Sequence, residues 1–208
     1  MSMQRTELLK ASPPMFESTL LDRFTRVHPA VPVILYAPVV LLFAVLAVIR
    51  DGWGDALILG VAGYAIWTLF EYWLHRLVFH FEPERGLGAR LHWMIHGVHH
   101  DHPNDPLRLV MPPAASIPLA IIVVGLMWLI AGGTHAPAVA AGFLTGYLVY
   151  DEMHYALHHR MPKSRLGKKL RELHMRHHFQ DDERGFGISA PYWDRLFGTY
   201  PTSRGRSG

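Results

Sequence analysis

Four long uncharged apolar stretches dominate the pattern of hydrophobic and polar positions along the chain. A helix rises about 1.5 Å per residue, so it needs roughly 20 residues to cross the hydrocarbon core of a bilayer. The stretches run over Val31–Ile49, Ala56–Phe70, Ala114–Ala131 and Ala136–Tyr150. The first and third nearly reach the required length alone, and the other two need their polar continuations, Glu71–His80 and Asp151–His159. The pattern predicts an all-α integral membrane protein and not a soluble protein with buried helices.

Two short turns that contain glycine, Arg50–Asp55 and Gly132–His135, connect the stretches in pairs. Short connections are typical of antiparallel helix hairpins, so we expect four transmembrane helices in two hairpins. Both turns then lie on one side of the membrane, and both termini lie on the other. Of the 20 Lys and Arg residues, only Arg50 is on the turn side, so the positive-inside rule makes the opposite side cytoplasmic. This topology explains the charge of +3, and we expect no nucleic-acid partner.

We divide the chain into a cytoplasmic N-terminal segment (1–30), a single membrane domain (31–200) and a flexible tail (201–208). Half of the residues are hydrophobic, which leaves little polar surface for a wholly soluble protein. Cysteine is absent, which excludes disulfides, thiolate metal sites and a cysteine nucleophile.

All but two of the 15 histidines lie in the segments 75–102 and 154–178, at the predicted cytoplasmic ends of the helices or just beyond them. Residues three and four apart share a helix face, so most of these histidines project to one side in spaced groups. His75 and His80 are five apart, about 140° around an ideal helix. They therefore bind different ions, or the last helical turn is loosened. The predicted ligands are His75, His80, His96, His99, His100, His154, His158, His174, His177 and His178.

These ten histidines predict a helical, cytoplasmic metal cap that holds two ions. Imidazole suits zinc, copper, iron and nickel, and metal ions in proteins take about four to six ligands. Ten imidazoles exceed what one ion can hold, so two ions are the simplest inference. Five further residues are expected to lie behind the ligands and to support them: His92, His159, Glu71, Asp151 and Asp194.

The motifs resemble those of the fatty acid hydroxylase branch of the membrane di-iron family that also contains sterol desaturases. The resemblance covers about residues 68–200, most of the predicted membrane domain. It includes Glu71–His80, His92–His100, Arg108–Pro113, Tyr150–His158, His174–Phe179 and Gly185–Thr199. Arg108–Pro113 and Gly185–Ser189 look closest to the fatty acid 2-hydroxylases of sphingolipid metabolism. The resemblance implies two iron ions, O2 and two electrons, and hydroxylation at carbon 2 of a fatty acid or sphingolipid N-acyl chain.

The resemblance also implies partners. Many eukaryotic relatives carry a cytochrome b5-like domain, and residues 1–30 are too short to hold one. We therefore expect a separate electron donor, either cytochrome b5-like or ferredoxin-like with its reductase, beside the lipid substrate and the membrane. Zinc has no redox chemistry, so it would occupy the ligands in purified protein without supporting the reaction.

Other functions stay open from the sequence. A hydroxylase or desaturase of a carotenoid, a sterol or a polar-lipid acyl chain would use the same histidines, because these serve the oxidant and not the substrate. A membrane zinc hydrolase would need a general-base carboxylate, for which Glu71, Asp151 and Glu152 are candidates. A membrane metal-binding or transport protein would spread ionisable residues through the bilayer, whereas here they gather at one face.

Two features lie in the C-terminal third. Ser164 predicts the start of a helix with leucines on one face and basic residues typical of a helix at the membrane surface or of a solvated face. Gly185, Gly187 and Ala190 satisfy the loose G-x-G-x-x-A dinucleotide pattern. No apolar strand precedes them, so we reject nucleotide binding.

Overall fold

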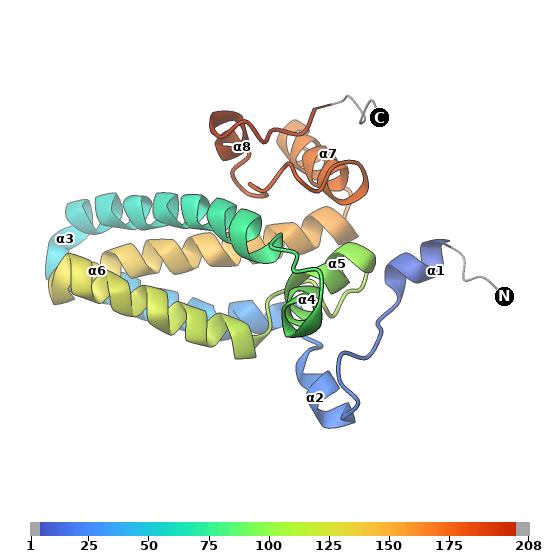
Figure 1. The fold of residues 1–208 in the computed structure, drawn as a ribbon. Helices are drawn as coiled ribbons and strands as arrows, with labels where there is room; N and C mark the ends of the chain where they lie inside the picture. Colours follow the sequence, from blue (N-terminus) through green and yellow to red (C-terminus); the bar gives the residue numbers. More distant parts are fainter. Residues whose placement is uncertain (1–4, 203–208) are drawn as a thin grey trace.

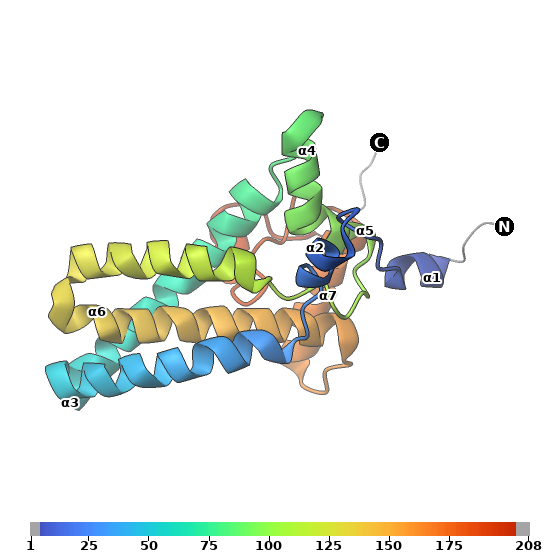
Figure 2. The ribbon, with the colours of Figure 1, turned by 90° about the horizontal axis from the view of Figure 1, so that it is seen from below.

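The paired apolar stretches form the two longest helices of the protein, α3 (Ala30–Leu74) and α6 (Pro113–His159). The computed structural model describes residues 5–202, and all regular structure in this part of the chain is helical, as predicted. Each long helix contains one residue with non-helical backbone angles, Gly52 (φ 74°, ψ 169°) and Gly132 (φ 72°, ψ 169°). Glycine adopts positive φ without a steric penalty. Figure 2 shows the chain reversing its direction at both points.

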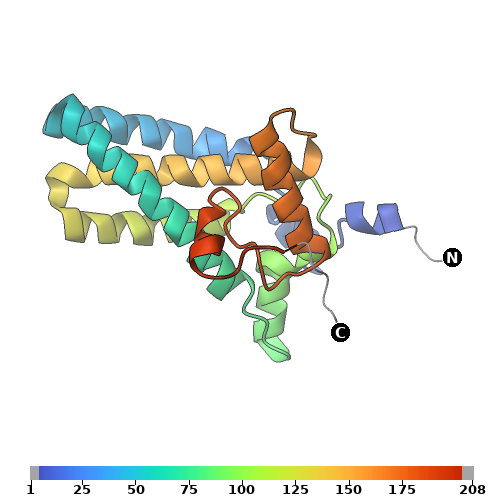
Figure 3. The ribbon, with the colours of Figure 1, turned by 90° about the horizontal axis from the view of Figure 1, so that it is seen from above.

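Short helices gather at the end of the bundle opposite these turns (Figure 1). Two of them, η1 (His75–Phe79) and η2 (Trp93–Gly97), are π-helices, in which hydrogen bonds join residues five apart. Figure 3 shows α7 (Arg165–Phe179, orange) lying across the ends of the long helices. The short helices are α1 (Arg5–Lys10), α2 (Thr19–Phe24), η1 (His75–Phe79), α4 (Gly86–His92), η2 (Trp93–Gly97), α5 (Val98–Asp101), α7 (Arg165–Phe179) and α8 (Tyr192–Leu196).

Small residues bring the second halves of α3 and α6 into close contact. An added Cβ on Gly142 would overlap the backbone oxygen of Gly60, and one on Gly63 would overlap that of Val139. Gly142 and Gly146 also have the G-x-x-x-G spacing that lets membrane helices approach closely. The two backbones therefore pack directly against each other along this contact.

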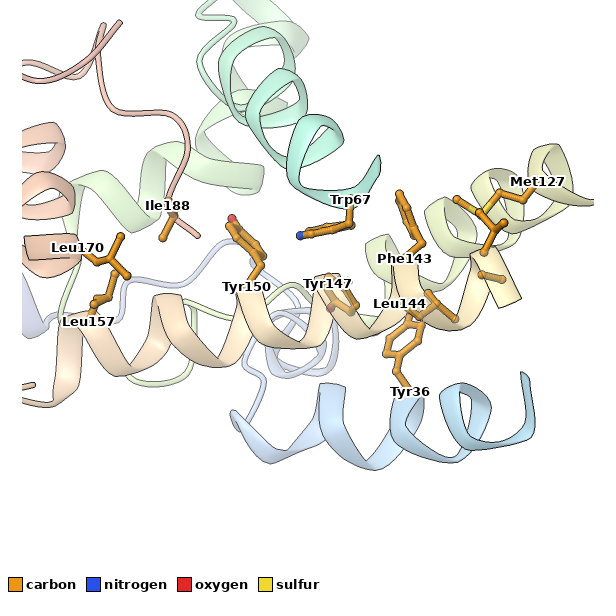
Figure 4. Packing of buried hydrophobic residues seen from close by; sticks show 12 residues of the cluster. Tyr36, Trp67, Met127, Phe143, Leu144, Tyr147, Tyr150, Leu157, Leu170 and Ile188 are labelled. Atoms are coloured by element: carbon orange, nitrogen blue, oxygen red, sulfur yellow. The ribbon is translucent and has the colours of Figure 1, made fainter. Parts of the chain in front are cut away.

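An aromatic core lies between the long helices (Figure 4). Tyr147 of α6 contacts Tyr36 in the first half of α3, with ring centroids 5.1 Å apart, and Trp67 in the second half, at 5.4 Å. Trp67 also contacts Phe143 at 5.1 Å. The core thus joins both halves of α3 to one helix, which continues from there to the histidines at its end.

The outer surfaces of α3 and α6 are apolar and exposed. The side chains of Ile49, Leu57, Leu129 and Ile130 have exposed fractions of 73%, 69%, 82% and 85%. Only 17% and 11% of the residues in the most apolar parts of the two helices are buried. A core helix of a soluble protein would be mostly buried, whereas large exposed apolar surfaces mark interaction with a membrane or a partner. Both helices are long and apolar enough to cross a membrane, so the structure supports a membrane protein.

The N-terminal segment packs on the loop that precedes α6. Arg108 is buried and donates a hydrogen bond to Asp22 at 3.0 Å, and Asp22 also accepts one from Arg26 at 3.0 Å. The backbone amide of Val27 donates to the carbonyl of Leu107 at 2.7 Å. These contacts give Arg108, in one of the motifs of the sequence, a structural role. Of the predicted flexible tail (201–208), residues 203–208 lie outside the described part of the chain.

Candidate metal centre

The ten predicted ligands lie together at the end of the bundle, in two groups of five. The first histidine group is His75, His80, His96, His100 and His177, and the second histidine group is His99, His154, His158, His174 and His178. Within each group, one ring nitrogen of every histidine lies within 4.8 Å of the other four. Elements far apart in the sequence supply them, so the fold brings every predicted ligand into one of two compact clusters.

The π-helix η1 explains how His75 and His80 enter the same group. An α-helix would separate side chains five apart by about 140°. Here the backbone amide of His80 donates to the carbonyl of His75, five residues earlier, at 3.1 Å. The Nε2 atoms of the two rings lie 3.2 Å apart. Of the two interpretations that the sequence left open, the structure supports the loosened helical turn.

The two groups lie next to each other because single helices contribute to both. On α5, His99 belongs to the second group and His100 to the first. On α7, His177 belongs to the first group, and its neighbour His178 to the second. The rings of His100 and His178, from different groups, have centroids 4.3 Å apart. The arrangement is therefore one dinuclear-sized cluster and not two remote sites.

The spacing of the ring nitrogens fits a metal ion in each group. Neighbouring Nε2 atoms lie 3.0 to 3.2 Å apart in the first group and 2.6 to 3.2 Å apart in the second. With metal–nitrogen bonds of about 2.1 Å, two ligands at right angles lie about 3.0 Å apart. Five nitrogens at this spacing fit five- or six-fold coordination, and iron is among the ions that imidazole suits.

The chemistry of the rings also fits a metal, because burial keeps them neutral. Burial, with the nearby histidines as a smaller cause, lowers the pKa of His80 and of His99 to about 3. Burial lowers the pKa of His177 to about 4. A histidine must be neutral to bind a metal. These rings are therefore available as ligands at neutral pH.

Hydrogen bonds fix the proton on the far side of two rings of the first group. His75 Nδ1 donates to the backbone carbonyl of Phe186 at 2.8 Å, and His177 Nδ1 donates to that of Arg184 at 2.7 Å. A carbonyl oxygen only accepts, so in a neutral ring Nδ1 carries the proton and Nε2 carries the lone pair. Such a bond behind a histidine ligand is usual in metal sites.

A family model for fatty acid hydroxylases matches residues 60–199, a range that contains all ten histidines. The chain belongs to the fatty acid hydroxylase family.

Relatives in this family carry related names. A dihydroceramide fatty acyl 2-hydroxylase of Arabidopsis thaliana is 44% identical over 144 residues, which cover 69% of this chain and 61% of the relative. A ceramide very long chain fatty acid hydroxylase of Saccharomyces cerevisiae is 36% identical over 195 residues, covering 92% of this chain and 50% of the relative. The chain thus spans about half to three fifths of the length of these relatives.

A solved structure of this hydroxylase family has the same fold. It is full-length Scs7p, in which only the hydroxylase domain is visible, and it superposes with a TM-score of 0.87 at 35% identity. The match covers 94% of this chain and 76% of that chain. The similarity therefore extends to the first half of α3, which precedes the segment that the family model covers.

The residues predicted to support the ligands lie close to them, but none has a described hydrogen bond to a ligand ring. His92 donates to the carbonyl of Phe79 at 2.7 Å, and the ring of His159 lies against that of Tyr155 at 4.4 Å. The ring of Phe79 stacks on His96 at 5.0 Å. His92 thus supports a ligand through Phe79 and not directly.

The three carboxylates of this predicted set are buried and bind backbone amides. Glu71 accepts from Ser189 at 2.7 Å, and Asp151 accepts from Met111 at 3.4 Å. Asp194 accepts from Phe186 and Gly187, each at 2.9 Å. The amides that they bind belong to residues outside the regular helices, and among the described residues no hydrogen bond joins these carboxylates to the ligand rings.

Sequence reasoning missed the carbonyls of Arg184 and Phe186, which are the direct partners of two ligands. Because both contacts use backbone oxygens, the identities of the two side chains gave no signal. The only hint was the G-F-G-I-S segment (Gly185–Ser189), which forms part of the family resemblance and overlaps the rejected nucleotide motif.

Proposed function

We propose that this protein is a membrane di-iron oxygenase that hydroxylates a lipid acyl chain at carbon 2. The substrate would be a fatty acid or a sphingolipid N-acyl chain, with O2 as co-substrate and two electrons from a separate redox protein. The observation that carries the proposal is the pair of adjoining groups of five histidines, in a chain of the fatty acid hydroxylase family that is 44% identical to a dihydroceramide fatty acyl 2-hydroxylase.

Each of the ten histidines would bind an ion through one ring nitrogen, and the neutral rings would add no ligand charge. Bound iron, with O2 and two electrons, supplies an oxidant able to break an unactivated C–H bond. Seven of the ten histidines are buried, which limits the access of water, and the bonds to Phe186 and Arg184 hold two of the rings in the ligating tautomer. The exposed apolar surfaces of α3 and α6 keep the centre next to lipid, where binding of the acyl chain can position its carbon.

We further propose that each long helix crosses the membrane twice, with its turn on one side and the histidine groups on the cytoplasmic side. The support is the exposed apolar surface on both halves of α3 and α6, together with the reversal at Gly52 and Gly132. The distribution of Lys and Arg, with only Arg50 near the turns, supports the proposed orientation.

The test is the lipid composition of cells that lack 2-hydroxy acyl chains and express this protein. We expect 2-hydroxy acyl chains to appear in total lipids by mass spectrometry, and to disappear with His99→Ala or His177→Ala. One variant lies in each histidine group and neither lies in α3 or α6, so the amount of membrane protein should fall much less than the product. A product hydroxylated at another carbon would keep the oxygenase and reject the proposed position.

A zinc hydrolase is less well supported by the site. It would need a general-base carboxylate at a metal-bound water. Glu71 and Asp151 instead accept hydrogen bonds from the amides of Ser189 and Met111. Accumulation of a cleaved lipid without a hydroxylated one would favour the hydrolase.

A further inference from the structure

The segment from Arg184 to Ser189 is a loop that contacts one histidine group from behind. It contains the two carbonyls that accept hydrogen bonds from His177 and His75. Its path is tightly bounded: Gly185 has a φ of +86°, and an added Cβ on Gly187 would lie 2.5 Å from the backbone oxygen of Ala190. The position of the two carbonyls therefore depends on whatever holds this loop.

Asp194 holds the middle of this loop, while Glu71 holds its end at Ser189. One carboxylate oxygen of Asp194 accepts from the backbone amide of Phe186 at 2.9 Å and from the hydroxyl of Thr199 at 2.8 Å. The other accepts from the amide of Gly187 at 2.9 Å. Asp194 has no exposed surface. Phe186 is therefore fixed on both sides, with its amide on Asp194 and its carbonyl on His75.

The second histidine group has no comparable support among the described residues. The Nδ1 atoms of His154, His158, His174 and His178 are buried and have no hydrogen-bond partner within residues 5–202. The described hydrogen bonds and ring contacts of the loop reach only rings of the first group, although His174 of the second group lines a small cavity beside it. Any effect of the loop on metal binding should therefore fall on one site.

We propose that Asp194 is a positioning residue for the metal ion of the first histidine group alone, acting through the carbonyls of Phe186 and Arg184. This inference rests on the proposed function, because it requires two bound ions. When the carboxylate is removed, the amides of Phe186 and Gly187 lose their acceptor, while Glu71 still holds Ser189. The carbonyls behind His75 and His177 are then no longer fixed in place. Loss of such a supporting contact weakens metal binding roughly 10- to 100-fold.

The experiment loads iron(II) anaerobically into the chelator-treated full-length protein and its variants, and measures ions per chain and the rate of their release to a chelator. We expect two ions in the unsubstituted protein. In Asp194→Ala we expect one ion to be lost or released roughly 10- to 100-fold faster, while the other is unchanged. Asp194→Asn should be intermediate, because its amide keeps one acceptor but presents an NH2 group to the other donor.

Double variants identify the ion. Adding His177→Ala to Asp194→Ala should remove no further metal, since both act on the first group. Adding His174→Ala should leave no tightly bound ion.

Asp22→Asn is the matched control, because Asp22 is a buried carboxylate that accepts a hydrogen bond from a backbone amide and lies far from the histidines in sequence. It should lower the unfolding temperature and keep both ions.

Two results would overturn the inference while leaving the dinuclear site intact. One is that Asp194→Ala and Asp194→Asn both keep two ions with unchanged release rates. The other is that both ions are lost together, in step with the unfolding temperature, which is the behaviour of a purely structural residue. An unsubstituted protein that binds fewer than two ions would instead contradict the proposed function, and the inference with it.

Discussion

Buried histidines that stay neutral lower the stability of the folded protein in acid, unless they bind a metal ion. Burial lowers the pKa of His80, His99 and His177 from their ordinary value of 6.5 to about 3 or 4. In the unfolded chain the same rings bind protons as the pH falls below about 6.5. Between these values the unfolded state binds more protons than the folded state, so the free energy of unfolding falls as the pH falls.

We therefore predict that the metal-free protein loses stability between pH 6.5 and pH 5, above the range in which ordinary carboxylates titrate. The measurement is the unfolding temperature of chelator-treated protein in detergent at pH 7.5, 6.5, 5.5 and 5.0. Metal-loaded protein should change less over the same range, because the ions hold the rings deprotonated. An unfolding temperature of metal-free protein that stays constant over this range would contradict the assigned burial of the rings.

At the scale of elements, the sequence predicted the long apolar helices and the places where they turn, but it left the local geometry of η1 open between two alternatives. The glycines with positive φ, Gly52 and Gly132, lie inside the two predicted turns, and α7 begins after Ser164, which accepts from the amide of Gly167 at 3.0 Å. The π-turn at His75–Phe79 depends on packing around the histidines, which single-residue preferences do not encode. For the same reason the sequence could group the ten histidines but not sort them into two sets of five.

The close contact between α3 and α6 makes Gly142 the most restrictive position in the bundle. Gly142→Ala would place a Cβ against the backbone oxygen of Gly60, so the helices must separate. Overpacking of this kind costs about 1–3 kcal/mol or more. Gly125→Ala, in the first half of α6, meets no atom within 4 Å and should be neutral or slightly stabilising.

The two variants are compared by their yield of monodisperse protein and by their unfolding temperature in detergent. We expect Gly142→Ala to lower both and Gly125→Ala to lower neither. Equal behaviour of the two would show that the backbones of α3 and α6 do not pack as closely as the structure has them.

At the scale of the whole molecule, the fold separates an apolar end that contains the turns from a polar end that contains the histidines. Arg50 donates to the carbonyl of Gly133, and His135 donates to Asp51 at 2.7 Å, so the two turns are joined to each other. The histidine groups lie at the opposite end, on η1 and His80 directly after it, and on η2, α5, α6 and α7. A membrane orientation that places one end in the cytoplasm therefore places the other across the bilayer.

Reporter fusions test this orientation. A reporter that is active only in the cytoplasm should give a signal when fused to either terminus and none when inserted at Gly132–His135. The terminal fusions control for expression of the inserted variant. A cytoplasmic signal from the Gly132–His135 insertion would reject the proposed four crossings.

The central claim is that the histidine groups support insertion of an oxygen atom from O2 into an acyl chain. The most direct measurement is the origin of that oxygen, determined by mass spectrometry of acyl chains from expressing cells grown under 18O2. We predict that each 2-hydroxy acyl chain gains one 18O atom, and that growth in H2 18O under ordinary O2 leaves the hydroxyl unlabelled. A hydroxyl labelled from water and not from O2 would contradict the oxygenase account.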